Sequence, residues 1–260
     1  MRAGARVLLI AAALACTGAM EVSTQTPVVK TLECLRKNAP QQLRVGDLRI
    51  EAQGEGVTTR YLGGRFVSRR DQGKLRAMLH VTAPADIAGT RYLLVEEASQ
   101  DALYLYLPAL GKARRVSGAG SDAEIAGTTL NYADLRLISQ ALSGAAITLE
   151  KPGEFQGRPA DVLRFTPAVA DSPYRRVLAT VDRESCVVLR ADFQNAERTL
   201  KQYRVDPASL QRSGAYRYAS RVTVEDLVRR STAQISLGDV RTDIKLPSRS
   251  FDPKNFFKAD

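Results

Sequence analysis

Residues 101–116 read DALYLYLPALGKARRV, and this stretch restricts the fold more than any other part of the chain. Three leucines alternate here with two tyrosines: Leu103, Leu105, Leu107, Tyr104 and Tyr106. A strand with this pattern carries large apolar side chains on both faces. It is either a core strand or a wall whose second face lines a cavity. The alternation leaves both interpretations open, and it also leaves open which face would line the cavity.

The residues that follow add a cationic end to this strand. Pro108 ends it, because proline cannot donate a hydrogen bond to a neighbouring strand. Lys112, Arg114 and Arg115 then lie at the edge of the predicted sheet. They are either solvated charges or a rim that faces a lipid headgroup. In the preceding strand, Leu93 and Val95 are further candidates for a cavity wall.

Composition is that of a folded protein. The 260 residues are 44% hydrophobic and 25% charged, which argues against disorder. The formal net charge of +10 comes from basic residues along the whole chain rather than from one basic tail. A solvated surface accounts for this distribution, and attraction to anionic lipid or to another acidic partner is the alternative.

The N-terminus has the order of charge, apolar run and small residues of a secretory signal. Arg2 and Arg6 precede the apolar run at 7–14, and cleavage is expected after Ala15 or Ala19. No other apolar run approaches the roughly 18 residues that span a bilayer. The mature protein is therefore expected to be exported and soluble.

The three cysteines have different expected fates. Cys16 is either removed with the signal or acylated, although Ala13 stands where a lipidation box usually has leucine. Cys34 and Cys186 form an even pair in an oxidising compartment, which predicts a disulfide; two separate buried thiols are the alternative. Closing so long a loop would stabilise the protein by about 4 to 5 kcal/mol in the chain-entropy model.

The body of the chain predicts antiparallel β-structure. Residues 74–82 alternate apolar and polar side chains, and Asp71-Gln72-Gly73 turns the chain back to residues 66–67 as a hairpin. Similar strands are predicted at 91–96, 147–149, 160–165, 177–181, 187–193, 198–205, 216–225 and 233–237. About ten strands at hairpin spacing indicate a meandering sheet or barrel.

Helices are few in this pattern. Pro27 in a first turn, with Val28, Leu32 and Leu35 on one stripe, predicts a helix that ends near Asn38. A second helix is predicted over residues 132–142. Their apolar stripes must lie on the sheet, which predicts a curved sheet with short helices across one face.

Motifs for catalysis are missing. His80 is the only histidine and lies on the polar face of its strand, which excludes histidine-rich metal sites and disfavours a catalytic triad. Residues 118–123 match G-x-G-x-x-A, but no strand and helix frame them as a dinucleotide site requires. Nucleic-acid modules are also missing. We expect no enzyme activity, no cofactor, no metal and no nucleic-acid partner.

Several motifs in order resemble the long subfamily of bacterial outer-membrane lipoprotein-sorting, or LolA-like, proteins. The resemblance rests on LYLYLPALGKARRVSG (103–118) followed by IAGTTLNYADL (125–135), with ECLRKNAP near the start. GRPADVLRF (157–165), SRVTVEDL (220–227) and the closing LPSRSFDPKNF fit the same pattern. Thr128-Thr129-Leu130 stand where the family has Ser-Asp-Phe.

This resemblance implies an unclosed antiparallel β-barrel in which a few short helices cover the concave face and enclose a hydrophobic cavity. With the signal at 1–19, it implies a single carrier domain at 20–260. The expected function is a periplasmic, non-enzymatic carrier of a lipid or of the acyl chains of a lipoprotein. Expected partners are an inner-membrane transporter of the resistance-nodulation or MMPL type and, transiently, the membrane surface. The alternative is a periplasmic protein-binding or stress-sensing module on the same half-barrel.

Overall fold

A computed structural model describes residues 27–55, 57–72, 74–97, 102–116, 129, 131, 146–166 and 173–258. The signal, Cys16 and the predicted second helix at 132–142 lie outside these residues. The helices are α1 (Pro27–Lys37), η1 (Pro108–Leu110), η4 (Pro207–Ser209), η5 (Ser248–Phe251) and η6 (Phe256–Lys258). The strands are β1 (Gln42–Gly54), β2 (Val57–Asp71), β3 (Lys74–Ala83), β4 (Arg91–Val95), β5 (Ala102–Leu107), β6 (Lys112–Val116), β7 (Ala146–Phe155), β8 (Arg158–Thr166), β9 (Arg176–Asp182), β10 (Val188–Gln194), β11 (Thr199–Val205), β12 (Leu210–Ser213), β13 (Tyr216–Ala219), β14 (Arg221–Asp226) and β15 (Ser231–Thr242).

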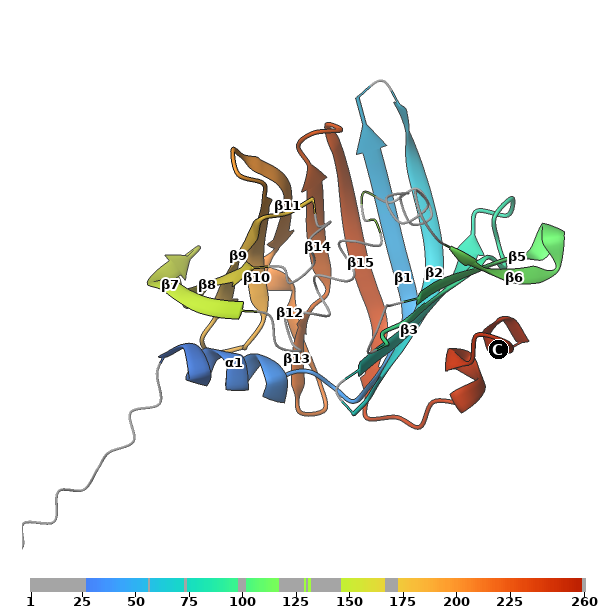
Figure 1. Ribbon diagram of the computed structural model, residues 1–260, viewed down its shortest axis with the longest axis horizontal. Helices are drawn as coiled ribbons and strands as arrows, with labels where there is room; N and C mark the ends of the chain where they lie inside the picture. Colours follow the sequence, from blue (N-terminus) through green and yellow to red (C-terminus); the bar gives the residue numbers. More distant parts are fainter. Residues whose placement is uncertain are drawn as a thin grey trace, which may run out of the picture.

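Thirteen of these strands form one antiparallel sheet, in the order β6-β5-β4-β3-β2-β1-β15-β14-β11-β10-β9-β8-β7. Two meanders, β6 to β1 and β15 to β7, are joined where β1 pairs with β15. The sheet curves without closing, because β6 and β7 remain its two edges (Figure 1). The predicted fold class, an unclosed antiparallel barrel with few short helices, is therefore confirmed.

Glycines allow the long central strands to bend. The register of β1 shifts beside Gly46, and that of β2 shifts between Gly63 and Gly64. A Cβ atom added at Gly64 would lie 2.8 Å from the carbonyl oxygen of His80. Such irregularities bend and twist a strand locally, which helps a wide sheet to curve.

One face of the sheet, here called the inner face, is apolar from strand to strand. Paired residues on this face form a row across eight strands from β1 to β7. The row consists of Ala52, Ala233, Val224, Tyr203, Ala191, Ala179, Leu163 and Leu149. Because each strand alternates, its remaining side chains lie on the opposite, outer face. Arginine and aspartate two residues apart pair there, as Arg69 and Asp71 do on β2.

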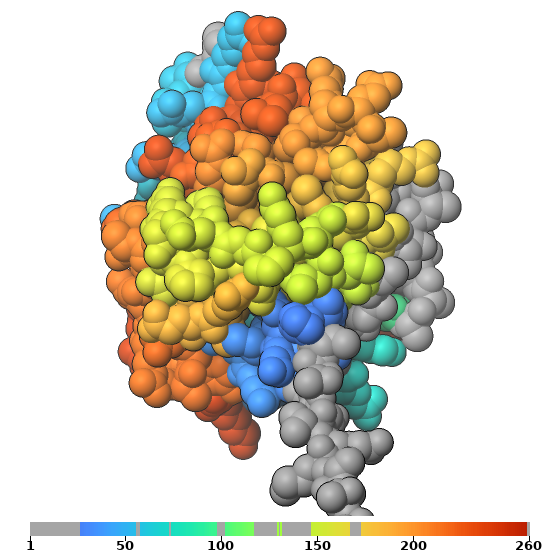
Figure 2. Space-filling view, turned by 90° about the vertical axis from the view of Figure 1, so that its left-hand side faces the viewer, coloured from blue at the N-terminus to red at the C-terminus, as the bar shows by residue number. Residues whose placement is uncertain are grey.

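The inner face supplies most of the buried core. Val45, Leu62 and Val81 pack in one cluster at the centre of the sheet. Leu163 and Val181 pack in a second cluster, which also contains Leu35 of α1. The helix thus lies across the inner face, and it contacts the edge strand β7, which Figure 2 shows directly above it.

On the outer face, the C-terminal segment (residues 248–258) covers an apolar region. Met78, Leu93 and Val95 pack there against Phe251 and Phe256, both almost fully buried. Backbone carbonyl groups of the segment are held by arginines of the sheet; the Nη1 of Arg91, for example, donates to the carbonyl oxygen of Phe256 at 3.0 Å. Figure 1 shows this segment beside β3 and β5 rather than in the continuous sheet.

Three strands were not predicted, and one prediction was wrong in its extent. β1, β6 and β12 were missed. The single strand expected at 216–225 is two strands, because the chain turns out of the sheet at Ser220. The Oγ of Ser220 donates to the carbonyl oxygen of Ser209 at 3.0 Å, which holds β12 and β13 together as a separate hairpin. The predicted N-terminal helix is α1, and β5 ends before Pro108 as expected.

Candidate functional site

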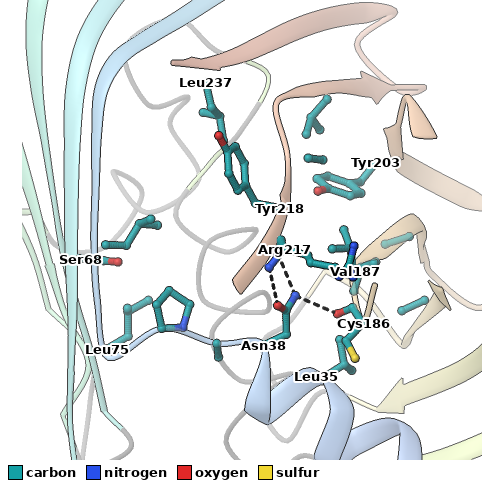
Figure 3. Close-up of a pocket in the computed structure, with 18 of the residues that line it drawn as sticks. Leu35, Asn38, Ser68, Leu75, Cys186, Val187, Tyr203, Arg217, Tyr218 and Leu237 are labelled. Atoms are coloured by element: carbon teal, nitrogen blue, oxygen red, sulfur yellow. Dashed lines mark hydrogen bonds between the residues drawn. The ribbon is translucent and has the colours of Figure 1, made fainter. Parts of the chain in front are cut away.

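A cavity of about 420 Å³ lies between the inner face, α1 and the β12–β13 hairpin (Figure 3). Its volume falls in the range of about 300–1,000 Å³ typical of small-molecule sites. The lining comes from both meanders: Ser68 and Leu75 on one side, and Val187 and Tyr203 on the other. The cavity therefore exists only where the curvature of the whole sheet brings the two meanders to face each other.

Small side chains on the inner face leave this space. Ala179 of β9 and Ala191 of β10 pair with each other at the cavity wall. Phe165, Val177 and Phe193 surround them, so the wall is apolar but not filled. An apolar cavity of this kind favours the hydrocarbon part of a ligand, since burying a methylene group gains about 0.8 kcal/mol.

The helix α1 is a fixed wall of the cavity. Leu35 and Asn38 line the cavity from the C-terminal end of the helix. Cys34 in the same turn forms a disulfide with Cys186, with 5.4 Å between their Cα atoms. The predicted disulfide is thus present, and it ties the helix to the segment between β9 and β10.

Two hydrogen-bonded contacts add to this tie. The Oγ1 of Thr31 donates to the buried Asp161 carboxylate at 2.6 Å. The Nδ2 of Asn38 donates to the carbonyl oxygen of Arg217 at 2.9 Å, and the Arg217 backbone N–H donates to the Oδ1 of Asn38 at 2.7 Å. Figure 3 shows this pair joining the end of the helix to β13. The helix and the hairpin are therefore one connected wall.

The segment that holds Cys186 is itself ordered by a buried carboxylate. Asp182 accepts two hydrogen bonds from Arg158, at 2.9 and 3.0 Å, and one from the Ser185 backbone N–H at 2.7 Å. Burial by itself would raise the pKa of Asp182, but the hydrogen bonds from Arg158 and Ser185 hold that pKa below its ordinary value. The turn is thereby positioned for the disulfide.

The β12–β13 hairpin is fixed at its other end to β15. The Oγ of Ser213 donates to the carbonyl oxygen of Val240 at 3.1 Å, and the Oγ1 of Thr242 donates to the carbonyl oxygen of Ser213 at 2.9 Å. Tyr218 of this hairpin lines the cavity and lies beside Leu237 in Figure 3. Both walls that cross the inner face are thus attached to the sheet.

Few polar groups face the cavity. The polar residues of the lining include Arg70, Arg217, Ser68, Tyr203 and Tyr218. Burial raises the pKa of Tyr203 to about 12, so its hydroxyl stays neutral at physiological pH. None of the described residues that line the cavity carries a carboxylate.

The predicted cavity residues are divided between the two faces of the sheet. Leu93, Val95, Tyr104 and Tyr106 lie on the outer face under the C-terminal segment, where the Tyr106 ring stacks on Phe257. Leu103 and Leu105 lie on the inner face, because they pair with Leu94 and Tyr92 of β4. Leu107 lies on the same face, two residues further along β5, where it pairs with the edge strand β6. None of these seven residues contributes to the lining of the described cavity.

The predicted rim arginines lie on the edge strand β6, outside the cavity lining. Arg114 pairs with Leu105 and Arg115 pairs with Tyr104, so the two side chains occupy opposite faces of the sheet. Only Arg114 therefore shares the inner face with the cavity. Both side chains are exposed.

Sequence reasoning missed the residues that line the cavity. In the sequence, Arg70 is distinguished only as a member of the basic pair Arg69-Arg70. In the structure, the two side chains of this pair lie on opposite faces of β2. Ala179 and Ala191 are small residues that pair with each other on the inner face. Two small residues indicate an unfilled space beside the sheet only when it is known that their strands pair.

The motif at 127–135 reaches the inner face at its described residues. The buried Nζ of Lys201 donates to the carbonyl oxygen of Thr129 at 2.7 Å and lies 3.8 Å from Asp226. Thr129 and Asn131 are themselves buried. A lysine of β11 thus holds part of this motif against the sheet.

Within the described part of the chain, no three histidine, cysteine, aspartate or glutamate side chains gather as a metal site would require. No helix in those ranges is long and apolar enough to cross a membrane.

The fold and the site define a class of protein, the unclosed antiparallel β-barrel with an apolar internal cavity. The chain belongs to a family whose model, described as an uncharacterized protein, matches residues 73–258. No curated protein matches the chain.

Solved structures share this fold. A DUF1329 family protein from Desulfovibrio piger is 19% identical with a TM-score of 0.77, over 88% of this chain and 98% of that one. An outer membrane lipoprotein-sorting protein domain from Vibrio parahaemolyticus is 18% identical with a TM-score of 0.78, over 89% and 97%. A LolA superfamily protein from Nitrosomonas europaea is 18% identical with a TM-score of 0.68, over 88% and 98%. The chain therefore has the LolA-like fold, as the resemblance of its sequence motifs to that family implies.

Proposed function

We propose that this protein is a non-enzymatic carrier that holds the hydrocarbon chain of a lipid or of an acylated lipoprotein in the cavity. The observation that carries the proposal is the apolar cavity between the inner face, α1 and the β12–β13 hairpin. An acyl chain of about 14 to 16 carbons gains about 0.8 kcal/mol for each methylene group that leaves water. Non-covalent burial alone is enough to hold such a chain.

The proposal also includes a compartment, the periplasm, and a partner, an inner-membrane transporter. An exported protein with this fold would receive or deliver its cargo in the periplasm, and the family resemblance implies an inner-membrane transporter of the resistance-nodulation or MMPL type as partner. The cargo would enter and leave the cavity at a place other than beneath α1. This helix could lift only if its disulfide and two sets of hydrogen bonds broke.

The first test is mass spectrometry of an organic extract of the protein, expressed in a bacterial periplasm and purified without detergent. A lipid present at about one per protein is expected. A second preparation carries Ala39→Trp, which places a large ring in the cavity from the loop after α1. The matched control is Ala208→Trp, at an exposed position in η4 away from the cavity.

The expected result is loss of most of the lipid from Ala39→Trp and normal loading of Ala208→Trp. Both variants should keep the circular dichroism spectrum of the parent protein. An extract with no lipid from the parent protein, or equal loading of the two variants, would contradict the proposal.

A further inference from the structure

Arg70 is a cation at the wall of the apolar cavity. It lies near the end of β2, pairs in register with Leu75 of β3, and shares the inner face with Ser68 two residues before it. All three residues line the cavity, and Ser68 and Leu75 are seen together on one side of it in Figure 3. The Arg70 side chain is half-buried.

Its guanidinium group lacks a carboxylate partner of the kind that the adjacent Arg69 has. Arg69, the preceding residue, lies 2.8 Å from the Asp71 carboxylate on the outer face. Within the residues that the structure describes, the Arg70 guanidinium makes no hydrogen bond or ion pair. Burial lowers the pKa of Arg70, and the charge of Glu96 acts against this lowering. The Oε2 of Glu96 instead accepts a hydrogen bond from the Leu75 backbone N–H at 2.7 Å.

The charged residues among the described lining are cations, and the carboxylate of Glu96 acts on Arg70 from outside that lining. Arg217 also belongs to the lining but is an exposed residue, and no carboxylate is found among the described lining residues. A desolvated cation without a bonded anion is costly, because the low-dielectric surroundings weaken its solvation. An anion that enters with an apolar chain would offset that cost and form charge-assisted hydrogen bonds with the guanidinium.

We propose that Arg70 binds the anionic headgroup of the cavity ligand, so that the cargo is an amphiphile with a carboxylate or phosphate group at one end of its hydrocarbon chain. This inference rests on the proposed carrier function. Arg70 supplies up to two parallel N–H donors to such a group, and the Ser68 hydroxyl on the same face supplies another. The hydrocarbon chain then extends toward the alanines of β9 and β10.

The test compares four ligands with the same 14-carbon chain and different heads. These are tetradecanoate, tetradecyl phosphate, tetradecanol and tetradecyltrimethylammonium, titrated by calorimetry below their micelle concentrations. The full protein is first freed of bound lipid on a hydrophobic resin. At least one anionic ligand should bind roughly tenfold more tightly than the alcohol, which is the scale expected for a charge-assisted contact.

Three variants assign this preference to one side chain. Arg70→Gln should bind the anionic ligands about as weakly as the alcohol, and Arg70→Lys should retain part of the preference. Arg65→Gln is the matched control, since Arg65 is an exposed arginine on the outer face of the same strand. It should bind all four ligands like the parent protein. Preference for tetradecanoate or for tetradecyl phosphate identifies the headgroup as a carboxylate or a phosphate.

The possible failures are distinguishable. Tight binding that does not depend on the head, or an anion preference unchanged in Arg70→Gln, would overturn the role of Arg70 while leaving the carrier function in place. Binding of none of the four ligands would contradict the carrier function and this inference together. Equal unfolding midpoints of Arg70→Gln and Arg65→Gln exclude misfolding as the cause of a loss.

Discussion

At the scale of single residues, buried charges hold the site together where they have partners. Asp161 accepts hydrogen bonds from Thr31 of α1 and from Arg183, and Lys201 contacts Thr129 and lies near Asp226. Each such group is stabilised by its partners and would be costly without them. Arg70 differs because its guanidinium has none among the described residues, and this is why it is the residue we assign to a ligand.

The carboxylate of Asp182 should make stability depend on acid pH. Its native pKa lies below its ordinary value, and the unfolded value is about 3.9. The ionised carboxylate therefore contributes fully at pH values above the unfolded pKa, and the contribution is lost as pH falls through the native pKa. Asp182→Asn should lower the free energy of unfolding at pH 7 by about 2 kcal/mol, the scale of hydrogen bonds to a charged group.

The measurement is urea unfolding of the parent protein and the variant between pH 7 and pH 2.5. The difference between them should shrink below about pH 4, since the parent protein then loses the same interaction. Asp86→Asn, at an exposed position, is the control and should follow the parent protein throughout. A difference between Asp182→Asn and the parent protein that stays constant with pH would contradict this account.

At the scale of elements, α1 depends on its attachments more than on its own helical propensity. It is an 11-residue helix, and isolated helices shorter than about 12 to 15 residues are marginal in water. Leu35 packs on the inner face, Arg36 and Lys37 stand favourably in the last turn, and Cys34 is bonded to Cys186. Without these attachments the helix would no longer form a fixed wall of the cavity.

Replacing Cys34 and Cys186 together by serine should destabilise the protein strongly. The disulfide joins residues 152 positions apart, and the chain-entropy model gives about 4 to 5 kcal/mol for a loop of that length. Guanidinium unfolding of the double variant and of the parent protein measures the change.

Thiol alkylation provides the control for this variant. In the parent protein without reductant, neither Cys34 nor Cys186 should be labelled, and after reduction in denaturant both should be. Strong labelling of the native, unreduced protein, or an unfolding midpoint unchanged by the double substitution, would show that the bridge does not hold the helix.

At the scale of the whole molecule, the cavity belongs to no single meander. Ser68 and Leu75 come from the first meander, Ala179 and Ala191 from the second, and the pairing of β1 with β15 brings them together. A ligand in this space contacts both halves of the sheet. Its binding should therefore be lost when either half unfolds, and it should stabilise the protein as a unit.

A bound amphiphile should raise the global free energy of unfolding. At a free ligand concentration of 100 times Kd, the expected gain is about 2.7 kcal/mol for a ligand that binds only the native state. Urea unfolding of lipid-free protein, with and without the tightest ligand of the 14-carbon series, measures it. Ala39→Trp should show no gain, and Ala208→Trp should show the full gain. A gain of equal size in Ala39→Trp would place the ligand outside the cavity.

Much of the local structure was predictable because it follows from neighbouring residues. Alternation identified the hairpin at 66–82 and most later strands, and Pro27 with its leucine stripe identified α1. β1 was missed although it is central, because its register shift beside Gly46 interrupts the alternation. β6 was missed because its basic residues resemble a solvated loop, whereas its backbone pairs with β5.

By itself, the sequence determined the class of fold, the helix α1 and the pairing of Cys34 with Cys186. Helix propensity, alternation and composition are local properties, so they can be read without the tertiary structure. The faces of the strands depend on tertiary structure. Leu103 and Tyr104 are both large residues of one alternating stretch, and the C-terminal segment covers the face of Tyr104. In the same way, Arg70 lines the cavity whereas Arg114 and Arg115 do not, because the curvature that brings β2 opposite β9 and β10 arises from thirteen strands pairing in order. That pairing joins residues far apart in the chain, and no local pattern encodes it.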